Sequence, residues 1–458
     1  MTFLGLIAGY FTLFLGGTGI ALLLMKDSRR INAIEFACLS WMLGVGLVSL
    51  CLWLGGILVS GLILQSLGTA ACLALGIVGW RMKQKRQIQF SMPRLNGLLE
   101  WVLGSLLLVE LGVIFFVSFK HTLGWDGLLN WEIKARYAFL NSGAVPQTYY
   151  SSADRAFSHP EYPLAIPFTE LWLYLWMGAP HQFWVKSIFP LFYISGALLL
   201  ALLINRLTGK RWLGLLIATV MPFVPFVLSS PGSVTVGYVD IPLGLFYAAA
   251  LGYFLCALQF SSKRALLIYA ALLALIPWIK TEGLILWAVL ALLGLCAGLV
   301  RRRVRWFLIA ALPGLLILLS WRFYLKVIHC VPPTDFARPS LELLSANFGR
   351  VSAIFRIVLI EITDVGLWSI FWLLLFVAVI YLVAARRLIT LILTAALLAP
   401  IVIYPLLYVF TTWPSYTAHV SSSLPRLFLQ LVPVGWLAIG LVLARPERQP
   451  ANLRSNVG

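Results

Sequence analysis

Charged side chains stand at the edges of long apolar segments in this sequence. Asp126 follows one apolar segment, and Asp240 opens another. Lys280 and Glu282 interrupt a third, and Arg426 begins the last one. A charged group beside hydrocarbon is costly unless it is solvated, paired or used in function. A carboxylate in such a place can accept a proton as a general base, and a cation can hold a phosphate group.

Each of these residues also has a purely structural explanation. Asp126 can be explained as the N-cap of a helix, with no further role. Lys280 and Glu282 can form a solvated turn between two spans. Arg426 can extend along the membrane surface to lipid phosphate. Arg322, near the end of another apolar segment, can pair with a carboxylate or contact the same phosphate as the other cations.

The segment SHPEYPLAIPFTELW places His159 and Glu161 beside two prolines that flank Tyr162. These prolines favour an extended backbone that leads into the helix that follows. A His–Glu pair can bind a metal ion or orient a substrate. No second His stands at helical spacing, so a metal site is weakly supported and ordinary loop polarity is the alternative.

The composition indicates what must position these residues. Of 458 residues, 61% are hydrophobic and 11% are charged, and the mean hydropathy is +0.95. A soluble domain could not cover so much apolar surface, and a disordered chain would have the opposite composition. About 13 segments approach the length of a membrane-spanning helix, so we expect an all-α polytopic membrane protein. They are 3–25, 33–53, 57–80, 98–118, 183–204, 212–229, 240–259, 265–279, 283–300, 306–328, 366–385, 388–410 and 426–444.

The net charge of +18 is explained by topology. If the spans alternate, 22 of the 34 Lys and Arg residues fall in connections on one side. The positive-inside rule then predicts an outer N-terminus and a cytoplasmic C-terminus. Nucleic-acid binding is disfavoured, because no basic patch lies in a soluble domain. The sequence has no nucleotide-binding motif, and its six cysteines show no spacing typical of disulfide frameworks or zinc sites.

The opposite face is expected to carry two long loops, about 119–182 and 329–365. Eleven of the 16 acidic residues and all five histidines fall on this face. From Asp126 the first loop has the pattern of an amphipathic helix, which should lie along the membrane surface and end at Gly143. Residues 163–177 are too few to span a bilayer and predict an interfacial or re-entrant helix, with Trp172, Trp176, Tyr174 and Glu170 in the headgroup layer.

Four segments in this order carry a family resemblance. They are WDGLLNWEIKARYAFLNSG from residue 125, HPEYPLAIPFTELWLYLWMG from residue 159, YVDIPLGLFYAAALGYF from residue 238 followed by PWIKTEGL, and SSSLPRLFLQLVP from residue 421. With them the chain resembles the GT-C superfamily of integral-membrane glycosyltransferases, most of all bacterial relatives of the protein O-mannosyltransferases and the lipid A aminoarabinose transferases. The resemblance implies a catalytic module over 98–445 that includes both outer loops, a three-helix addition over 1–97 and a cytoplasmic tail over 446–458.

The resemblance also implies a reaction. A hexosyl or pentosyl group would move, with inversion, from a polyprenyl-phosphate donor to a glycan, lipid or protein acceptor outside the cytoplasm, at a bacterial plasma membrane. Asp126 matches the catalytic acidic residue that follows a transmembrane helix in the family. Family members often carry a second acidic residue beside it; here Gly127 follows, so Glu132 or Asp240 would have to serve, and a divalent cation is only weakly supported.

Further roles follow from the same resemblance. Lys280, Arg426 and Arg322 would contact the donor phosphate. The sugar or acceptor pocket would be shaped by His159, Glu161, Asp240, Glu282, Trp125 and Trp131. The alternative for the two tryptophans is the ordinary aromatic belt of a membrane protein.

Two other functions fit such a chain. A transporter or flippase for lipid-linked or polar solutes would place ionisable residues near the bilayer midplane, on broken helices in matched halves. This sequence gathers them at one face and shows no obvious inverted repeat, which favours the enzyme. A noncatalytic scaffold is the third possibility, and the presence of an acidic residue at Asp126 argues against it.

Overall fold

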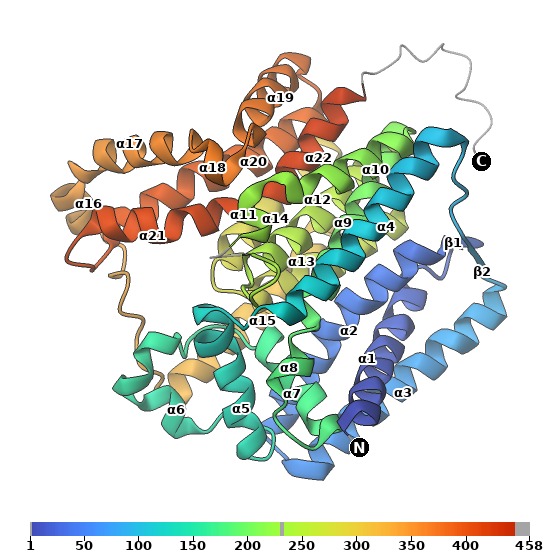
Figure 1. Ribbon diagram of the computed structural model, residues 1–458, viewed down its shortest axis with the longest axis horizontal. Helices are drawn as coiled ribbons and strands as arrows, with labels where there is room; N and C mark the ends of the chain where they lie inside the picture. Colours follow the sequence, from blue (N-terminus) through green and yellow to red (C-terminus); the bar gives the residue numbers. More distant parts are fainter. Residues whose placement is uncertain (1, 230–232, 445–458) are drawn as a thin grey trace.

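The computed structural model describes residues 2–229 and 233–444, and these residues fold almost entirely into helices (Figure 1). Nine helices in the described part of the chain are long and apolar enough to cross a membrane, or eleven if two bent pairs each count as one span. The nine are α1 (Thr2–Leu24), α2 (Ala33–Gly56), α3 (Gly61–Arg86), α4 (Gly97–Lys120), α8–α9 (Gln182–Thr208), α12 (Asp240–Phe260), α14 (Gly283–Val300), α15 (Val304–Val327) and α20–η4 (Leu388–Phe410). The prediction of an all-α polytopic membrane protein is confirmed, whereas the count of 13 spans is not.

Prolines account for part of the difference. The expected span 212–229 is interrupted, because α10 (Arg211–Val220) gives way to η3 (Met221–Phe223) and then to α11 (Pro225–Leu228). Pro222 and Pro225 lie at the starts of these two short elements, and a proline cannot donate the backbone hydrogen bond that a continuous helix needs. The expected span 366–385 is also broken, but without a proline: α18 (Val365–Trp368) is separate from α19 (Phe371–Ala385), and Ser369 between them has a φ of +50°.

Two helix pairs are bent. The chain bends by 48° between α21 (Tyr416–Leu429) and α22 (Val432–Leu443), where one straight span is expected. The expected outer loop 329–365 contains a second pair, α16 (Leu341–Asn347) and α17 (Arg350–Ile362), which bends by 70° and is apolar enough to be a broken span or a re-entrant loop. In Figure 1, α16, α17 and α21 extend together to the left of the main bundle.

Several basic connections meet at one end of the bundle. Strand β1 (Arg30–Asn32) pairs in parallel with β2 (Gln89–Ser91), which joins the first and third helix connections. Nearby, Glu35 binds both Arg206 and Arg264 at 2.7 and 2.8 Å. We call this region, with β1, β2 and the connections at Arg206–Arg211 and Ser261–Arg264, the basic end. The gathering of these basic connections follows the charge pattern of the sequence.

The opposite end holds the short helices of the first long loop. These are η1 (Gly127–Glu132), α5 (Ile133–Leu140), α6 (Gln147–Ser151), η2 (Ala153–Ser158) and α7 (Ala165–Met177). Helix α7 has 13 residues and does not qualify as a span, as expected; of the two expected alternatives, burial contradicts an interfacial helix and leaves the re-entrant one. It packs against α1, α2 and α5 and is buried on nearly every side, with Trp172 donating a hydrogen bond to the Gly9 carbonyl at 3.0 Å. The prediction that Trp172, Tyr174 and Glu170 face the headgroup layer is therefore wrong.

The three N-terminal helices are integrated with the rest of the bundle. Helices α1, α2 and α3 pack on one another, and α2 also contacts α9 (Ile188–Thr208) and α13 (Lys263–Ile279). The proposed boundary near residue 97 stays a prediction. The expected cytoplasmic tail over 446–458 lies outside the described residues.

Candidate functional site

The site is built around Asp240, the first residue of α12, whose side chain is fully buried. Lys280 Nζ donates to Asp240 Oδ1 at 2.7 Å, and Gln430 Nε2 donates to the same oxygen at 2.8 Å. Arg426 Nε and Nη2 both lie 3.3 Å from Asp240 Oδ2. Three donor side chains, one from the turn between α13 and α14 and two from the end of α21, thus compensate one buried carboxylate, as a charge in such a place requires.

Arg426 connects Asp240 to Asp126. Its Nη2 also donates to Asp126 Oδ2, and its guanidinium lies over the Tyr238 ring, 4.7 Å from the ring centroid. The Asp126 side chain makes no capping hydrogen bond at the start of η1, so the explanation of Asp126 as an N-cap is wrong. The structure brings together Asp126, Asp240, Lys280, Glu282 and Arg426, which the sequence singled out separately; we call them the carboxylate–cation cluster.

Backbone contacts hold Asp126 in place. The Gly124 N–H donates to the Val236 carbonyl at 2.8 Å, which fixes the chain after α4 against the turn before α12. A Cβ atom at position 127 would lie 2.7 Å from the Val236 oxygen and 3.0 Å from the Gly237 oxygen. This close approach requires glycine, which explains why no second acidic residue stands beside Asp126.

Lys280 is buried between two carboxylates. Its Nζ lies 3.0 Å from Glu282 Oε1 in addition to its contact with Asp240, and the residue is only 2% exposed. Burial alone would lower the pKa of Lys280, but Asp240 and Glu282 raise this pKa above its ordinary value. Lys280 therefore carries its charge inside the protein, and the explanation of this segment as a solvated turn is wrong.

The two cations retain unused donors. Among the described residues, Arg426 uses Nε and Nη2, and Nη1 has no partner. Lys280 uses its ammonium for Asp240 and Glu282, so one of its three N–H groups remains. These two unused donors are the groups of the cluster that could contact an additional anion.

A second group of residues lies next to this cluster. Trp131, Tyr162 and His159 form a stack, with ring centroids 5.5 Å apart for the first pair and 4.6 Å apart for the second. His159 Nδ1 lies 3.4 Å from Glu161 Oε1, and its Nε2 lies 3.7 Å from Asp335 Oδ2. The predicted pair of His159 and Glu161 is thus close together, and a second loop supplies Asp335. We call the three rings the aromatic stack.

Lys134 supports the aromatic stack from inside. Its ammonium donates to the carbonyl oxygens of Asn130 and His159 at 2.9 and 2.7 Å, and the residue is fully buried. Burial lowers the pKa of Lys134 to about 7, although Glu161 opposes this change. The expectation of an amphipathic helix along the membrane surface is therefore wrong, because Asn130 and Lys134 are buried in the protein, as are Trp131 and Ala135 of the apolar face.

Tyr162 joins the two groups. Burial raises the pKa of Tyr162, and the nearby carboxylates of Glu282, Glu161 and Asp126 raise it further. Tyr162 therefore lies within electrostatic reach of carboxylates from the cluster and from the stack. Two buried oxygen atoms, Glu282 Oε2 and Asn130 Oδ1, have no hydrogen-bond partner in the described part of the chain. Buried polar atoms are rarely left unpaired, so they are candidate contacts for a bound polar ligand.

Two of the expected site residues lie apart from this arrangement. Trp125 is 64% exposed, and Arg322 is exposed and forms no ion pair with any described residue. One residue that sequence reasoning missed is Gln430, which binds Asp240 and accepts a hydrogen bond from Tyr404 at 2.8 Å. The available signal was its position four residues after Arg426, a spacing that places both side chains on one helix face.

The arrangement does not offer a preformed metal site. Across residues 2–229 and 233–444, no group of three or more His, Cys, Asp or Glu side chains is placed to hold a metal ion. Asp126 Oδ2 and both carboxylate oxygens of Asp240 are engaged by Arg426, Lys280 and Gln430 instead. The residues present therefore fit an anion better than a divalent cation.

The arrangement places the Asp126 carboxylate beside two buried cations, Arg426 and Lys280, with the aromatic stack next to them. No family model, curated protein or solved structure matches this chain, so the family resemblance rests on the sequence segments alone.

Proposed function

We propose that this protein is a membrane glycosyltransferase that moves a sugar from a polyprenyl-phosphate donor to an acceptor at the extracytoplasmic face. The observation that supports it best is the pairing of Asp126 with Arg426 beside Asp240 and Lys280. This places a candidate general base and two candidate phosphate ligands within one connected network. Such a network suits a reaction in which an acceptor loses a proton while a phosphate leaves.

In this proposal, Asp126 removes the proton from the acceptor hydroxyl. Arg426 orients the Asp126 carboxylate through the Nη2 contact, and the Tyr238 ring packs against the same guanidinium. The oxygen–sugar bond to the acceptor forms as the bond between the sugar and the donor phosphate breaks, with inversion at the sugar carbon. The acceptor proton goes to Asp126, and the electron pair of the broken bond goes to the phosphate.

The departing phosphate gains negative charge and needs cations. Arg426 Nη1 and the remaining N–H of Lys280 are the donors left over from the internal pairs. Both side chains are mostly buried, which strengthens their interaction with a phosphate relative to the same contact in water. Arg322 is not needed for this role.

The aromatic stack supplies a surface for the sugar or the acceptor. Trp131 is fully buried, whereas the His159 side chain is 22% exposed, so the stack reaches from the interior toward open space. Aromatic faces suit the apolar side of a sugar ring, and Glu161 and Asp335 beside His159 can accept hydrogen bonds from hydroxyl groups.

The decisive experiment is Asp126→Asn. Membranes with equal amounts of the wild-type and variant proteins would be incubated with labelled polyprenyl-phosphate sugars, and transfer to endogenous acceptors would be measured. Loss of transfer is expected. Asp154→Asn is the matched control, because Asp154 is an exposed carboxylate in the same loop and should leave transfer unchanged. Transfer by Asp126→Asn near the wild-type rate would refute the assignment.

A transporter or flippase is the second candidate, and one observation favours it. Glu170 on α7 is fully buried, and neither of its carboxyl oxygens has a partner among the described residues. Burial raises the pKa of Glu170 well above its ordinary value, and the neighbouring Glu132 adds to this effect. Carboxyl groups that bind protons inside a membrane protein are common in proton-coupled carriers. Movement of the labelled donor across the membrane without sugar transfer would support this function. The absence of both movement and transfer would indicate a scaffold.

A further inference from the structure

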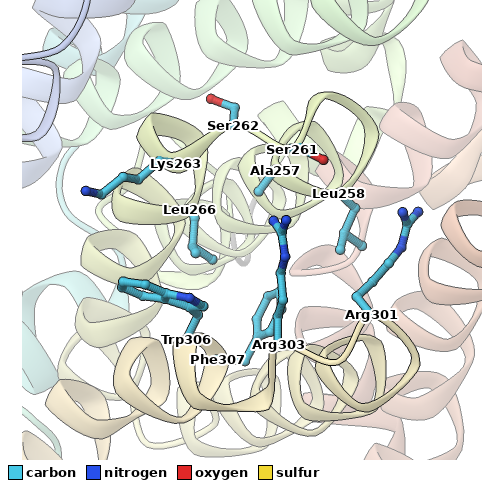
Figure 2. Close-up of a pocket in the computed structure, with 10 residues that line it drawn as sticks. All are labelled: Ala257, Leu258, Ser261, Ser262, Lys263, Leu266, Arg301, Arg303, Trp306 and Phe307. Atoms are coloured by element: carbon cyan, nitrogen blue, oxygen red, sulfur yellow. The ribbon is translucent and has the colours of Figure 1, made fainter.

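A pocket of about 370 Å³ opens at the basic end, far along the helices from the carboxylate–cation cluster. It lies between the connection from α12 to α13 and the connection from α14 to α15 (Figure 2). Its polar lining consists of Ser261, Ser262, Lys263, Arg301 and Arg303, and Trp306 forms part of its apolar wall.

The arginines of this pocket have no anionic partner in the protein. Neither Arg301 nor Arg303 forms an ion pair with any residue in the described ranges. Elsewhere at this end, arginines are neutralised: Arg206 and Arg264 bind Glu35, and Arg211 binds Glu100. The pocket therefore concentrates positive charge that the protein itself leaves uncompensated.

The two arginine side chains extend into the pocket from the same connection. Figure 2 shows the guanidinium groups of Arg301 and Arg303 extending in the same direction, toward the segment that contains Ala257, Leu258 and Ser261, whereas Lys263 points away from them. Two parallel guanidinium groups beside a serine hydroxyl match an anion with several acceptor oxygens, such as phosphate.

The backbone adds to this preference. Helix α13 begins at Lys263 and α15 begins at Val304, directly after lining residues of the pocket. The free N–H groups and the dipole at a helix N-terminus favour negative charge. Two helix starts therefore reinforce the charge of the two arginines.

The apolar part of the lining fits a membrane lipid. Trp306 is about half exposed, and Leu266 and Phe307 complete a wall next to the cations. A Trp beside basic residues at the end of spanning helices is typical of the headgroup layer. A lipid would place its phosphate on the arginines and its first carbons along this wall.

We propose that this pocket binds a phosphate group at the basic end of the protein. Anionic phospholipid headgroups and free inorganic phosphate share the chemistry that the arginines recognise, and basic pockets between membrane helices commonly hold the former. The proposal does not depend on glycosyl transfer, because none of its residues belongs to the carboxylate–cation cluster. It also differs from the positive-inside rule, which needs charge in a connection but no pocket.

The test uses the full-length protein in nanodiscs of phosphatidylcholine with increasing fractions of phosphatidylglycerol. Native mass spectrometry would count phosphatidylglycerol molecules retained by the wild type, Arg301→Gln, Arg303→Gln and the double variant. Each substitution is expected to weaken retention by at least about tenfold, because it removes a charge-assisted hydrogen bond to the phosphate in addition to a charge near the anionic surface. Arg305→Gln is the matched control, because it removes the same charge from an exposed neighbour that does not line the pocket.

A second arm distinguishes the sources. Inorganic phosphate would be titrated into the protein in pure phosphatidylcholine nanodiscs, with the temperature of unfolding as the readout. Stabilisation by phosphate that Arg303→Gln abolishes, without selective lipid retention, would assign the pocket to a soluble phosphate. Arg303→Lys should bind more phosphate than Arg303→Gln does. Such partial binding would show that the loss in Arg303→Gln is not caused by misfolding. Equal loss in Arg305→Gln, or no binding of either probe, would overturn the proposal.

Discussion

Arg426 on α21 pairs with Asp126, which precedes it by 300 residues, and the same guanidinium lies 3.3 Å from Asp240 Oδ2. One side chain thus links the loop after α4 to the start of α12. Because Asp240 is fully buried, the link concerns stability as well as function. The contribution of Arg426 to stability must therefore be measured separately from its proposed contribution to phosphate binding.

Arg426→Lys and Arg426→Ala separate them. Alanine leaves Asp126 and Asp240 short of a cation, and removal of one partner from a buried pair costs about 3–5 kcal/mol. Lysine retains the charge but has no planar fork with which to hold two carboxylates and a phosphate. We expect Arg426→Lys to unfold near the wild-type temperature while its apparent KM for the polyprenyl-phosphate donor rises. Donor dependence equal to that of the wild type in folded Arg426→Lys would contradict the phosphate role.

The pair of Asp240 and Lys280 gives a second prediction. Asp240→Asn leaves the buried Lys280 with Glu282 as its nearest carboxylate, and Lys280→Met leaves Asp240 with Arg426. Either single variant should lower the unfolding temperature more than the double variant Asp240→Asn/Lys280→Met does, because the double variant removes both members of the pair. Additive losses in the double variant would show that the two side chains are not coupled.

The sequence predicts which residues are unusual but not how they pair. Asp126, Asp240, Lys280 and Arg426 stand out because each interrupts or borders an apolar segment. Their mutual contacts depend on how distant helices pack, and no local pattern encodes that a loop and a helix 300 residues apart share a guanidinium. The helical class of the fold could be predicted because the periodicity and length of apolar segments are local properties of the sequence. The pairing could not, because it depends on contacts between distant segments.

Burial explains the wrong predictions. For α7 the expectation is a helix with Glu170 in the headgroup layer, and for the segment η1–α5 it is an amphipathic helix along the membrane surface. In the structure, Glu170 and Lys134 point into protein instead, since other helices cover both elements. The hydrophobic pattern indicates which residues are kept from water, but it does not indicate whether the polar residues between them contact water, lipid or protein.

Lys134 makes the stability of the protein depend on pH. Its pKa of about 7 in the folded protein is below its ordinary value of 10.5. Between these two values the unfolded chain binds more protons than the folded protein, so Lys134 should make the protein more stable as the pH rises from about 7 toward 10. Its destabilising effect is greatest below pH 7, where the buried ammonium is charged. In Lys134→Gln this part of the rise should disappear.

The measurement is the unfolding temperature in detergent from pH 6 to pH 10. Lys326→Gln is the control, because Lys326 is an exposed lysine, and it should retain the wild-type pH dependence. An identical pH dependence for Lys134→Gln and the wild type would mean that Lys134 is not the titrating group.

Gly127 provides a test of how tightly Asp126 must be placed. In Gly127→Ala the new Cβ atom would approach the Val236 oxygen to 2.7 Å, so the chain after α4 has to move away from the turn before α12. Overpacking of this kind costs about 1–3 kcal/mol. Because Asp126 adjoins this contact, the movement should also draw its carboxylate away from Arg426. We therefore expect glycosyl transfer to fall by at least about tenfold, since a small displacement of a catalytic group lowers the rate out of proportion to its size.

Gly112→Ala is the matched control: Gly112 lies within α4 with no atom within 4 Å of the added Cβ, and alanine there should preserve both transfer and stability. Full transfer activity in Gly127→Ala would mean that the position of Asp126 beside Arg426 does not govern the reaction.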